Sequence, residues 1–145
     1  MTVKIVKLQE NAQIPTYGSI SAAGADLYAC IENPVSILPG QTILIPTGLS
    51  MEIEEGFAGF IYARSGLATK RGLAPANKVG VIDSDYRGQV MVSLHNHTDM
   101  PQCVEPGERV AQIVFAPVYQ AEFAMVDALQ ETERGTGGFG STGTK

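Results

Sequence analysis

The chain has 145 residues, of which 44% are hydrophobic and 17% charged, so it can form one domain with a sizeable core and is too apolar for a disordered protein. Its net charge of −5 argues against a protein that coats nucleic acid, and no apolar run is long enough to span a membrane. The first residues lack the apolar block of a secretory signal, so a cytoplasmic location is expected, with a nuclear or viral origin left open.

Short strands are predicted along most of the chain, separated by turn residues such as Pro39-Gly40 and Pro106-Gly107. Many short strands with regular turns favour an all-β sandwich or barrel over alternating βα units, and the pattern alone does not distinguish a jelly roll from other sandwiches. The expected strands span residues 3–8, 25–30, 35–38, 42–45, 49–53, 57–62, 89–94, 109–118 and 122–126.

One short helix is expected over residues 65–71, with Ser65 as its N-cap. Free backbone N–H groups at a helix start favour an anion, so Arg64, Ser65 and Gly66 are candidate phosphate ligands. The alternative is an exposed arginine followed by an ordinary cap. Cys30 and Cys103 are expected to be buried thiols, with a disulfide left open.

Strand alternation over residues 109–118 places Arg109 on one face with Ala111, and Gln112 on the opposite face. A glutamine among valines is either a satisfied core amide or a ligand contact, and both interpretations stay open. Asp26 stands where a strand begins. A single carboxylate holds Mg²⁺ only with help from a substrate's phosphates and from water, and the alternative is a turn aspartate.

Residues 79–88 are interpreted as a β-hairpin with residues 83–88 at its tip. A carboxylate fixed at a strand end, such as Asp83, can act as a general base toward water, although Asp-Ser-Asp is also typical of turns. His95 and His97 have no third ligand nearby in the sequence, so a zinc site is not expected. The chain also lacks a P-loop and a Gly-x-Ser-x-Gly elbow.

The last twelve residues, 134–145, are too rich in glycine for a packed core. They nevertheless carry Arg134, Phe139, Ser141 and Thr142, which are suited to holding a flat ring and a phosphate chain. A frayed end and a gripping arm are the two interpretations.

Taken in order, five segments resemble the five motifs of the trimeric deoxyuridine triphosphatases (dUTPases). These segments are residues 23–29, 64–66, 80–88, 107–112 and 134–143. The resemblance covers nearly the whole chain, and its third and fifth motifs are long and specific. One departure is Ala63, where the family often has proline before Arg-Ser-Gly.

The resemblance implies a homotrimer of distorted jelly-roll barrels with shared active sites. It divides the chain into a domain over residues 1–133 and a flexible arm over residues 134–145 that closes over a site. The implied reaction is hydrolysis of dUTP to dUMP and pyrophosphate with Mg²⁺ as cofactor, which limits uracil in DNA and supplies dUMP for dTMP synthesis.

The resemblance also implies residue roles: Asp83 activates the attacking water, and Asp26 helps to hold Mg²⁺ through water. Tyr86 would lie beneath the deoxyribose. The implied phosphate contacts are Arg64, Ser65, Gly66, Gln112, Arg134, Ser141 and Thr142. The implied uracil contacts are Asn77, Gly80, Val81, Ile82 and Phe139, with Gly140 also in the substrate site.

Two rival functions remain. The related dCTP deaminases share the fold but carry a glutamate in the strand after the aspartate segment, and residues 91–96 contain none. The other rival is a non-catalytic β trimer that binds partners. The joint presence of the candidate site residues argues against it.

Overall fold

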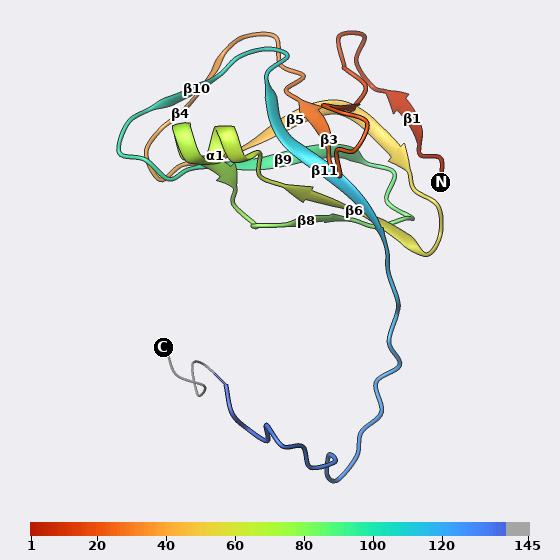
Figure 1. The fold of residues 1–145 in the computed structure, drawn as a ribbon. Helices are drawn as coiled ribbons and strands as arrows, with labels where there is room; N and C mark the ends of the chain where they lie inside the picture. The colour runs from red at the N-terminus through yellow and green to blue at the C-terminus, as the bar shows by residue number, and fades with distance from the viewer. Residues whose placement is uncertain (139–145) are drawn as a thin grey trace.

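In the described chain, residues 1–138 of a computed structural model, the regular structure is short antiparallel strands with one short helix (Figure 1). This confirms the all-β expectation. The elements are β1 (Lys4–Lys7), β2 (Thr16–Tyr17), β3 (Ala25–Tyr28), β4 (Val35–Ile37), β5 (Thr42–Glu52), β6 (Phe57–Tyr62), α1 (Ser65–Arg71), β7 (Leu73–Pro75), β8 (Gly80–Ile82), β9 (Gln89–Asn96), β10 (Gln102–Val104) and β11 (Arg109–Pro117).

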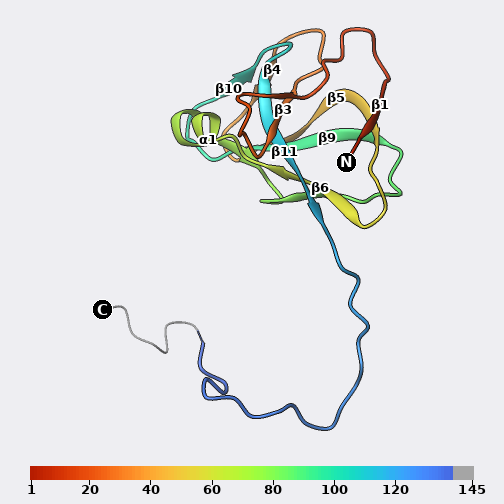
Figure 2. The same cartoon turned by 45° about the vertical axis from the view of Figure 1, so that its right-hand side comes forward.

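The strands form two main sheets and a two-stranded ribbon (Figures 1 and 2). One sheet has the order β1-β5-β9-β7, the other has the order β2-β3-β11-β6-β8, and β10 pairs with β4. Strands far apart in sequence are neighbours, because β11 pairs with both β3 and β6. The core takes its buried side chains from both main sheets, including Leu27 and Ile113 from one and Val92 and Leu94 from the other.

The predicted bounds of β6 and α1 are confirmed to the residue, but the predicted N-cap is wrong. Arg64, not Ser65, is the N-cap: its backbone is extended, and its carbonyl accepts a hydrogen bond from the Ala68 N–H at 2.9 Å. No side chain caps this end. Gly72 ends the helix in the left-handed conformation with φ of 60°.

The two strands predicted on either side of Pro46-Thr-Gly48 are one strand, β5, so the expected turn there is wrong. The register against β9 shifts between Pro46 and Ser50, which marks a bulge rather than a chain reversal. Tertiary bonds hold the bulge: Leu8 N–H donates to the Gly48 carbonyl, and Thr47 Oγ1 donates to the Val90 carbonyl.

Gly48 is the residue that this bulge requires. Its φ is +69°, and a Cβ there would lie 2.6 Å from Cys30 Sγ and 2.8 Å from Ala12 Cβ. Gly48→Ala is therefore expected to lower the free energy of unfolding by about 2–4 kcal/mol, through left-handed strain plus overpacking. Gly40→Ala is the matched control, because Gly40 has φ of +70° but open space around it.

Denaturant unfolding of both variants checks this expectation. Gly40→Ala should lose only the backbone part, about 1–2 kcal/mol. Equal losses in the two variants would show that the contacts around Gly48 contribute nothing.

The expected hairpin over residues 79–88 is also wrong. β8 pairs with β6, whereas β9 pairs with β5 and β7, so the two strands belong to different sheets. Residues 83–88 thus form a corner between the sheets and not a hairpin tip. A sequence of two short strands with a turn between them does not reveal this, because hairpins and corners use the same turn residues.

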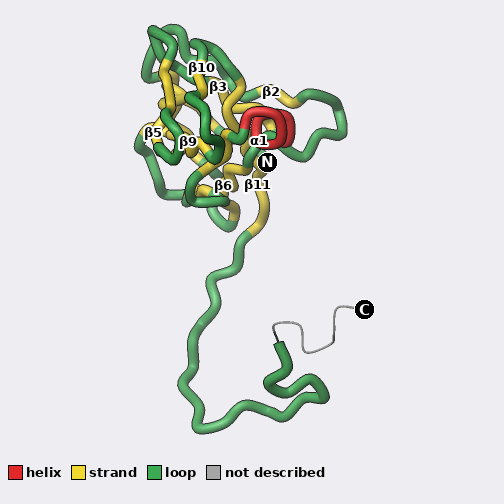
Figure 3. The backbone as a smooth tube through the Cα atoms, turned by 90° about the vertical axis from the view of Figure 1, so that its left-hand side faces the viewer, coloured by secondary structure: helices red, strands yellow, loops and turns green. Residues whose placement is uncertain are grey.

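The strand predicted over residues 122–126 does not form in the single chain. Residues 119–136 are all exposed, and in Figures 1–3 the tail after β11 runs away from the sheets. Phe123 is 95% exposed and Met125 fully so. A strand requires a partner for its backbone groups, and the chain offers this segment none among its described residues.

The cysteine prediction is half right. Cys30 is buried, and burial raises the pKa of its thiol, whereas Cys103 is exposed; neither is in a disulfide. Among residues 1–138, no helix is long and apolar enough to cross a membrane.

Candidate active site

A cluster of polar side chains surrounds Asp26 on β3. Arg64 donates from Nε to Asp26 Oδ1 at 2.7 Å, and Arg109 donates to Asp26 Oδ2 at 3.3 Å. Asp26 is nearly buried, at 9% exposure, so the two guanidinium groups compensate a carboxylate that would otherwise be costly to bury. Two cations against one carboxylate leave the cluster with net positive charge, which suits an anionic ligand.

A β-bulge brings Arg109 to this cluster. Register with β3 shifts between Arg109 and Ala111, so Arg109 pairs with Tyr28 while Gln112 pairs with Asp26. Residues 26 and 28 share one face of β3, and Arg109 therefore lies on the same face as Gln112. The expected alternation, which put Arg109 with Ala111, is wrong at this point. Arg109 is the clearest site residue that strand alternation misses.

Gln112 is a half-buried member of the same cluster. Its Nε2 donates to the Ala63 carbonyl at 2.9 Å, which connects β11 to the segment before α1. A Cβ at Gly24 would lie 2.5 Å from Gln112 Oε1, so only glycine leaves room for this amide. Gln112 was expected to be either a satisfied amide or a ligand contact. In the structure its amide is hydrogen-bonded and also lies beside the candidate phosphate ligands.

The start of α1 borders the cluster. Ser65 and Gly66 are exposed, and a Cβ at Gly66 would meet nothing within 4 Å. The structure therefore brings five predicted residues together here: Asp26, Arg64, Ser65, Gly66 and Gln112.

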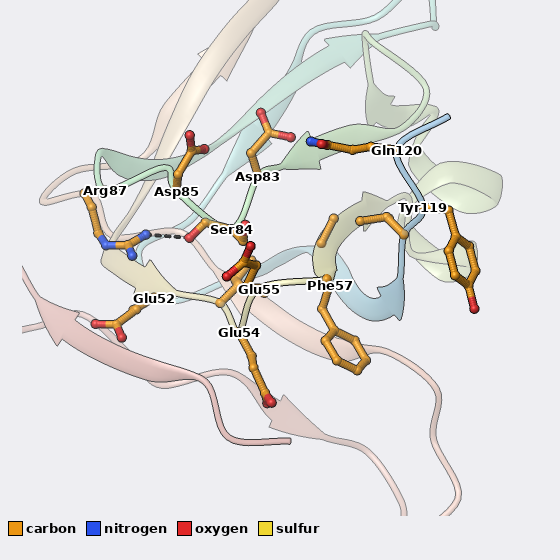
Figure 4. Close-up of a pocket in the computed structure, with 14 residues that line it drawn as sticks. Glu52, Glu54, Glu55, Phe57, Asp83, Ser84, Asp85, Arg87, Tyr119 and Gln120 are labelled. Atoms are coloured by element: carbon orange, nitrogen blue, oxygen red, sulfur yellow. Dashed lines mark hydrogen bonds between the residues drawn. The ribbon is translucent and has the colours of Figure 1, made fainter. Parts of the chain in front are cut away.

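Asp83 lies elsewhere, directly after β8 at the corner between the sheets, and its side chain is exposed. A large open hollow of about 1070 Å³ lies on one side of it (Figure 4). Five carboxylates line this hollow against one arginine: Glu52, Glu54, Glu55, Asp83 and Asp85 against Arg87. Such a surface repels phosphate, so this hollow is a poor place for an anionic ligand.

A smaller pocket of about 350 Å³ also borders Asp83. Most of its wall is apolar or aromatic, with few polar groups, which is typical of a pocket for a small ring system. The lining residues are Leu44, Val81, Ile82, Asp83, Tyr86, Gln89 and Met91. Sequence reasoning named four of them, Val81, Ile82, Asp83 and Tyr86, and had no signal for the contributions of β5 and β9.

The loop before β8 has an unusual backbone. Lys78 has φ of +65° and is the only residue other than glycine with positive φ among residues 1–138. The Val79 N–H donates to the Asn77 carbonyl at 2.7 Å, which closes a three-residue turn around it. Strained backbone of this kind concentrates at binding sites, and Asn77 and Gly80 stand on either side of it.

The two groups of site residues are separated within the chain. Gln112 is opposite Tyr62 on one side of β6, and Ile82 is opposite Gly59 on the other side. Strand rise and spacing then place the Cα atoms of Gln112 and Asp83 about 15 Å apart. The chain therefore presents a phosphate-type cluster and a ring-type pocket beside a carboxylate, but not both at one point.

The predicted ligands in the arm are only partly described. Arg134 is exposed, and its Nε donates to the Gly137 carbonyl at 2.8 Å. The described tail lies away from the sheets in Figure 3. Phe139, Gly140, Ser141 and Thr142 lie outside the described residues.

The fold is an all-β sandwich with two features: a cationic cluster, and a pocket for a small ring beside a carboxylate. This combination is typical of β proteins that have a nucleotide-type site. Comparison with known proteins specifies the family. The family profile described as dUTPase matches residues 10–143. The chain belongs to the dUTPase family.

Curated relatives agree along the full length. The deoxyuridine 5'-triphosphate nucleotidohydrolase of Photorhabdus laumondii is 51% identical, over 97% of this chain and 95% of its own. The protein of the same name from Polynucleobacter asymbioticus is 49% identical, over 99% of this chain and 97% of its own.

Solved structures show the same fold. A mutant dUTPase of phage 80alpha superposes with a TM-score of 0.88 at 27% identity, covering 97% of this chain and 98% of that one. A second mutant of the Staphylococcus bacteriophage 80alpha dUTPase, solved with dUpNHpp, gives a TM-score of 0.86 at 26% identity, covering 99% of each chain. The fold class is the jelly roll of that family, as the sequence motifs implied.

Proposed function

We propose that this chain hydrolyses dUTP to dUMP and pyrophosphate, which limits uracil in DNA and supplies dUMP for dTMP synthesis. The observation that carries the proposal is the cluster of Arg64, Arg109 and Gln112 around Asp26, in a chain of the dUTPase family. Relatives at about half identity are named for this reaction, and a related phage enzyme was solved with dUpNHpp.

Asp83 is the proposed general base. Its carboxylate removes a proton from a water, the water oxygen forms a bond to the α-phosphorus, and the bond from that phosphorus to the bridging oxygen breaks. Pyrophosphate leaves with the electron pair. Phosphoryl chemistry of this type needs mainly positioning and charge stabilisation, which the arginines of the cluster supply.

The smaller pocket is the proposed place for the nucleoside, because its wall is mostly apolar and it begins at Asp83. Backbone groups of residues 80–82 and the Asn77 side chain would bond the uracil edge. Cytosine would present a donor where an acceptor is required, and each unpaired buried group costs about 1–3 kcal/mol. Tyr86 on the pocket wall would exclude a ribose hydroxyl.

Mg²⁺ is the proposed cofactor, and the donor set fits it only together with the substrate. Among residues 1–138, no group of three His, Cys, Asp or Glu side chains could hold a metal ion by itself. Mg²⁺ prefers a carboxylate or two plus phosphate oxygens and water, so Asp26 with a triphosphate is a suitable set. Bound there, the ion would neutralise charge on the triphosphate, while the ion pairs with Arg64 and Arg109 orient the Asp26 carboxylate.

A homotrimer with shared sites is proposed for two reasons. The Cα atoms of Asp83 and of Gln112, which belongs to the Asp26 cluster, are about 15 Å apart in one chain, whereas the proposed mechanism requires Asp83 and this cluster to act on one triphosphate. The tail also exposes large apolar side chains, including Tyr119, Phe123, Met125 and Leu129. Strand residues without a partner in one chain find one in a second copy, and the segment 122–126 is the proposed contact.

Pyrophosphate release from dUTP tests the proposal, with dCTP, dTTP and UTP as competing substrates and with EDTA to remove the metal. We expect rapid release from dUTP alone and loss of release with EDTA. Absence of release from dUTP would contradict the proposed reaction, and ammonia from dCTP would support the deaminase instead. A protein that stays monomeric at micromolar concentration while fully active would contradict the shared site.

A further inference from the structure

Gly88, at the end of the corner segment, lies against the hydroxyl end of the Tyr86 side chain. A Cβ at Gly88 would lie 2.3 Å from the Tyr86 hydroxyl oxygen, 2.5 Å from Cζ and 2.9 Å from Cε2. Non-bonded carbons are stable near 3.5–4.0 Å, so any side chain here must displace the ring. The smallest substitution, alanine, requires a movement of about 1 Å or more.

The backbone itself does not require glycine at this position. The described glycines with positive φ are residues 40, 48, 56, 72, 107 and 135, and Gly88 is not among them. An L-residue can therefore adopt its backbone conformation without strain. What the absent side chain provides is space for the ring.

One hydrogen bond holds the hydroxyl end of the ring, and another holds the Tyr86 backbone. The Tyr86 hydroxyl donates to the Gln89 carbonyl at 3.0 Å, and the Tyr86 N–H donates to the Asp83 carbonyl at 3.2 Å. The ring held in this way is part of the wall of the smaller pocket, next to Asp83. Displacing it changes the shape of that wall and breaks the bond to Gln89.

We infer that Gly88 is a positioning residue that determines sugar specificity by fixing the Tyr86 ring; this rests on the proposed function of the pocket. Steric exclusion of one hydroxyl requires a wall placed within a fraction of an ångström, because a looser wall admits both sugars. Gly88→Ala is expected to weaken binding of the deoxynucleotide and to lower the preference for deoxyribose over ribose by about tenfold.

The test measures nucleotide binding rather than turnover. Non-hydrolysable analogues of dUTP and UTP are titrated calorimetrically into the full-length wild type, Gly88→Ala and the control Gly18→Ala. Gly18 has open space around it and no positive φ, so its variant should keep the wild-type preference. An unchanged preference in Gly88→Ala, or a wild type without preference, would overturn the inference.

A double-mutant cycle distinguishes an effect through the ring from a general loss of structure. In a Tyr86→Leu background, Gly88→Ala should cause no further change in preference, since the ring through which Gly88 acts is gone. A further fall in the double variant would overturn the inference.

Proton NMR supplies a readout that needs neither activity nor a folded Gly88 variant. The Gly88 Hα resonance should carry a ring-current shift from Tyr86 in the wild type and should return to its ordinary range in Tyr86→Leu. No such shift would overturn the inference. A wild type that prefers the dUTP analogue but releases no pyrophosphate would contradict only the proposed reaction.

Discussion

Asp83→Asn should reduce dUTP hydrolysis by about 10²–10⁴-fold while leaving nucleotide binding nearly unchanged. Asparagine keeps the shape of aspartate but cannot take a proton from water at neutral pH. The structure gives the substitution little else to disturb, because the Asp83 side chain is exposed and its carbonyl, which accepts from Tyr86 N–H, is retained. Steady-state pyrophosphate release and binding of a non-hydrolysable dUTP analogue measure the two effects separately.

Asp85→Asn is the matched control, since Asp85 is in the same corner and lines the acidic hollow with Asp83 (Figure 4). Its variant should keep most of the rate. Equal rates for wild type and Asp83→Asn would remove Asp83 as the base, and an equal loss in both variants would indicate a charge effect of the corner and no specific proton transfer.

Local chemistry explains which elements the sequence could predict. Gly56 stands just before β6 and Gly72 just after α1, and both have positive φ. The conformation of Gly56 marks where β6 begins, and that of Gly72 marks where α1 ends. The bounds of both elements follow from such nearby residues. The same reasoning fails for β5, where Pro46-Thr-Gly48 reads as a turn but is a bulge that distant partners hold.

The candidate site shows the same division. The residue types at Asp26, Arg64, Gln112 and Asp83 stand out in the sequence because their order matches a family pattern. How these residues group in space cannot be read from the sequence, because it depends on which strands pair. Arg109 reaches Asp26 only through the β11 bulge, and strand alternation puts it on the opposite face.

Removing residues 134–145 should lower turnover about as much as removing the general base. A chain shortened after Glu133 is expected to keep its fold and assembly but to lose about 10³-fold or more in turnover, because it lacks Arg134 as a source of positive charge for the phosphates. The family motif implies that the arm closes over bound nucleotide. We expect such closure to cost about 1–2 kcal/mol for each residue that it orders, and to be offset by contacts that form only with nucleotide bound.

Two comparisons make the truncation informative. Arg134→Ala in the full chain separates the charge from the rest of the arm, and a loss close to that of the truncation would assign most of the effect to this side chain. A chain shortened after Val118 also lacks Tyr119, Phe123 and Met125, the exposed apolar residues of the tail.

Analytical ultracentrifugation and pyrophosphate release should then separate two roles along one continuous tail. The shorter chain should lose assembly together with activity, whereas the chain ending at Glu133 should lose activity alone. Full activity in the chain ending at Glu133 would show that the arm is a frayed end after all. Intact trimers of the chain ending at Val118 would mean that the subunits are held together by the sheets, with the tail free to serve only the site.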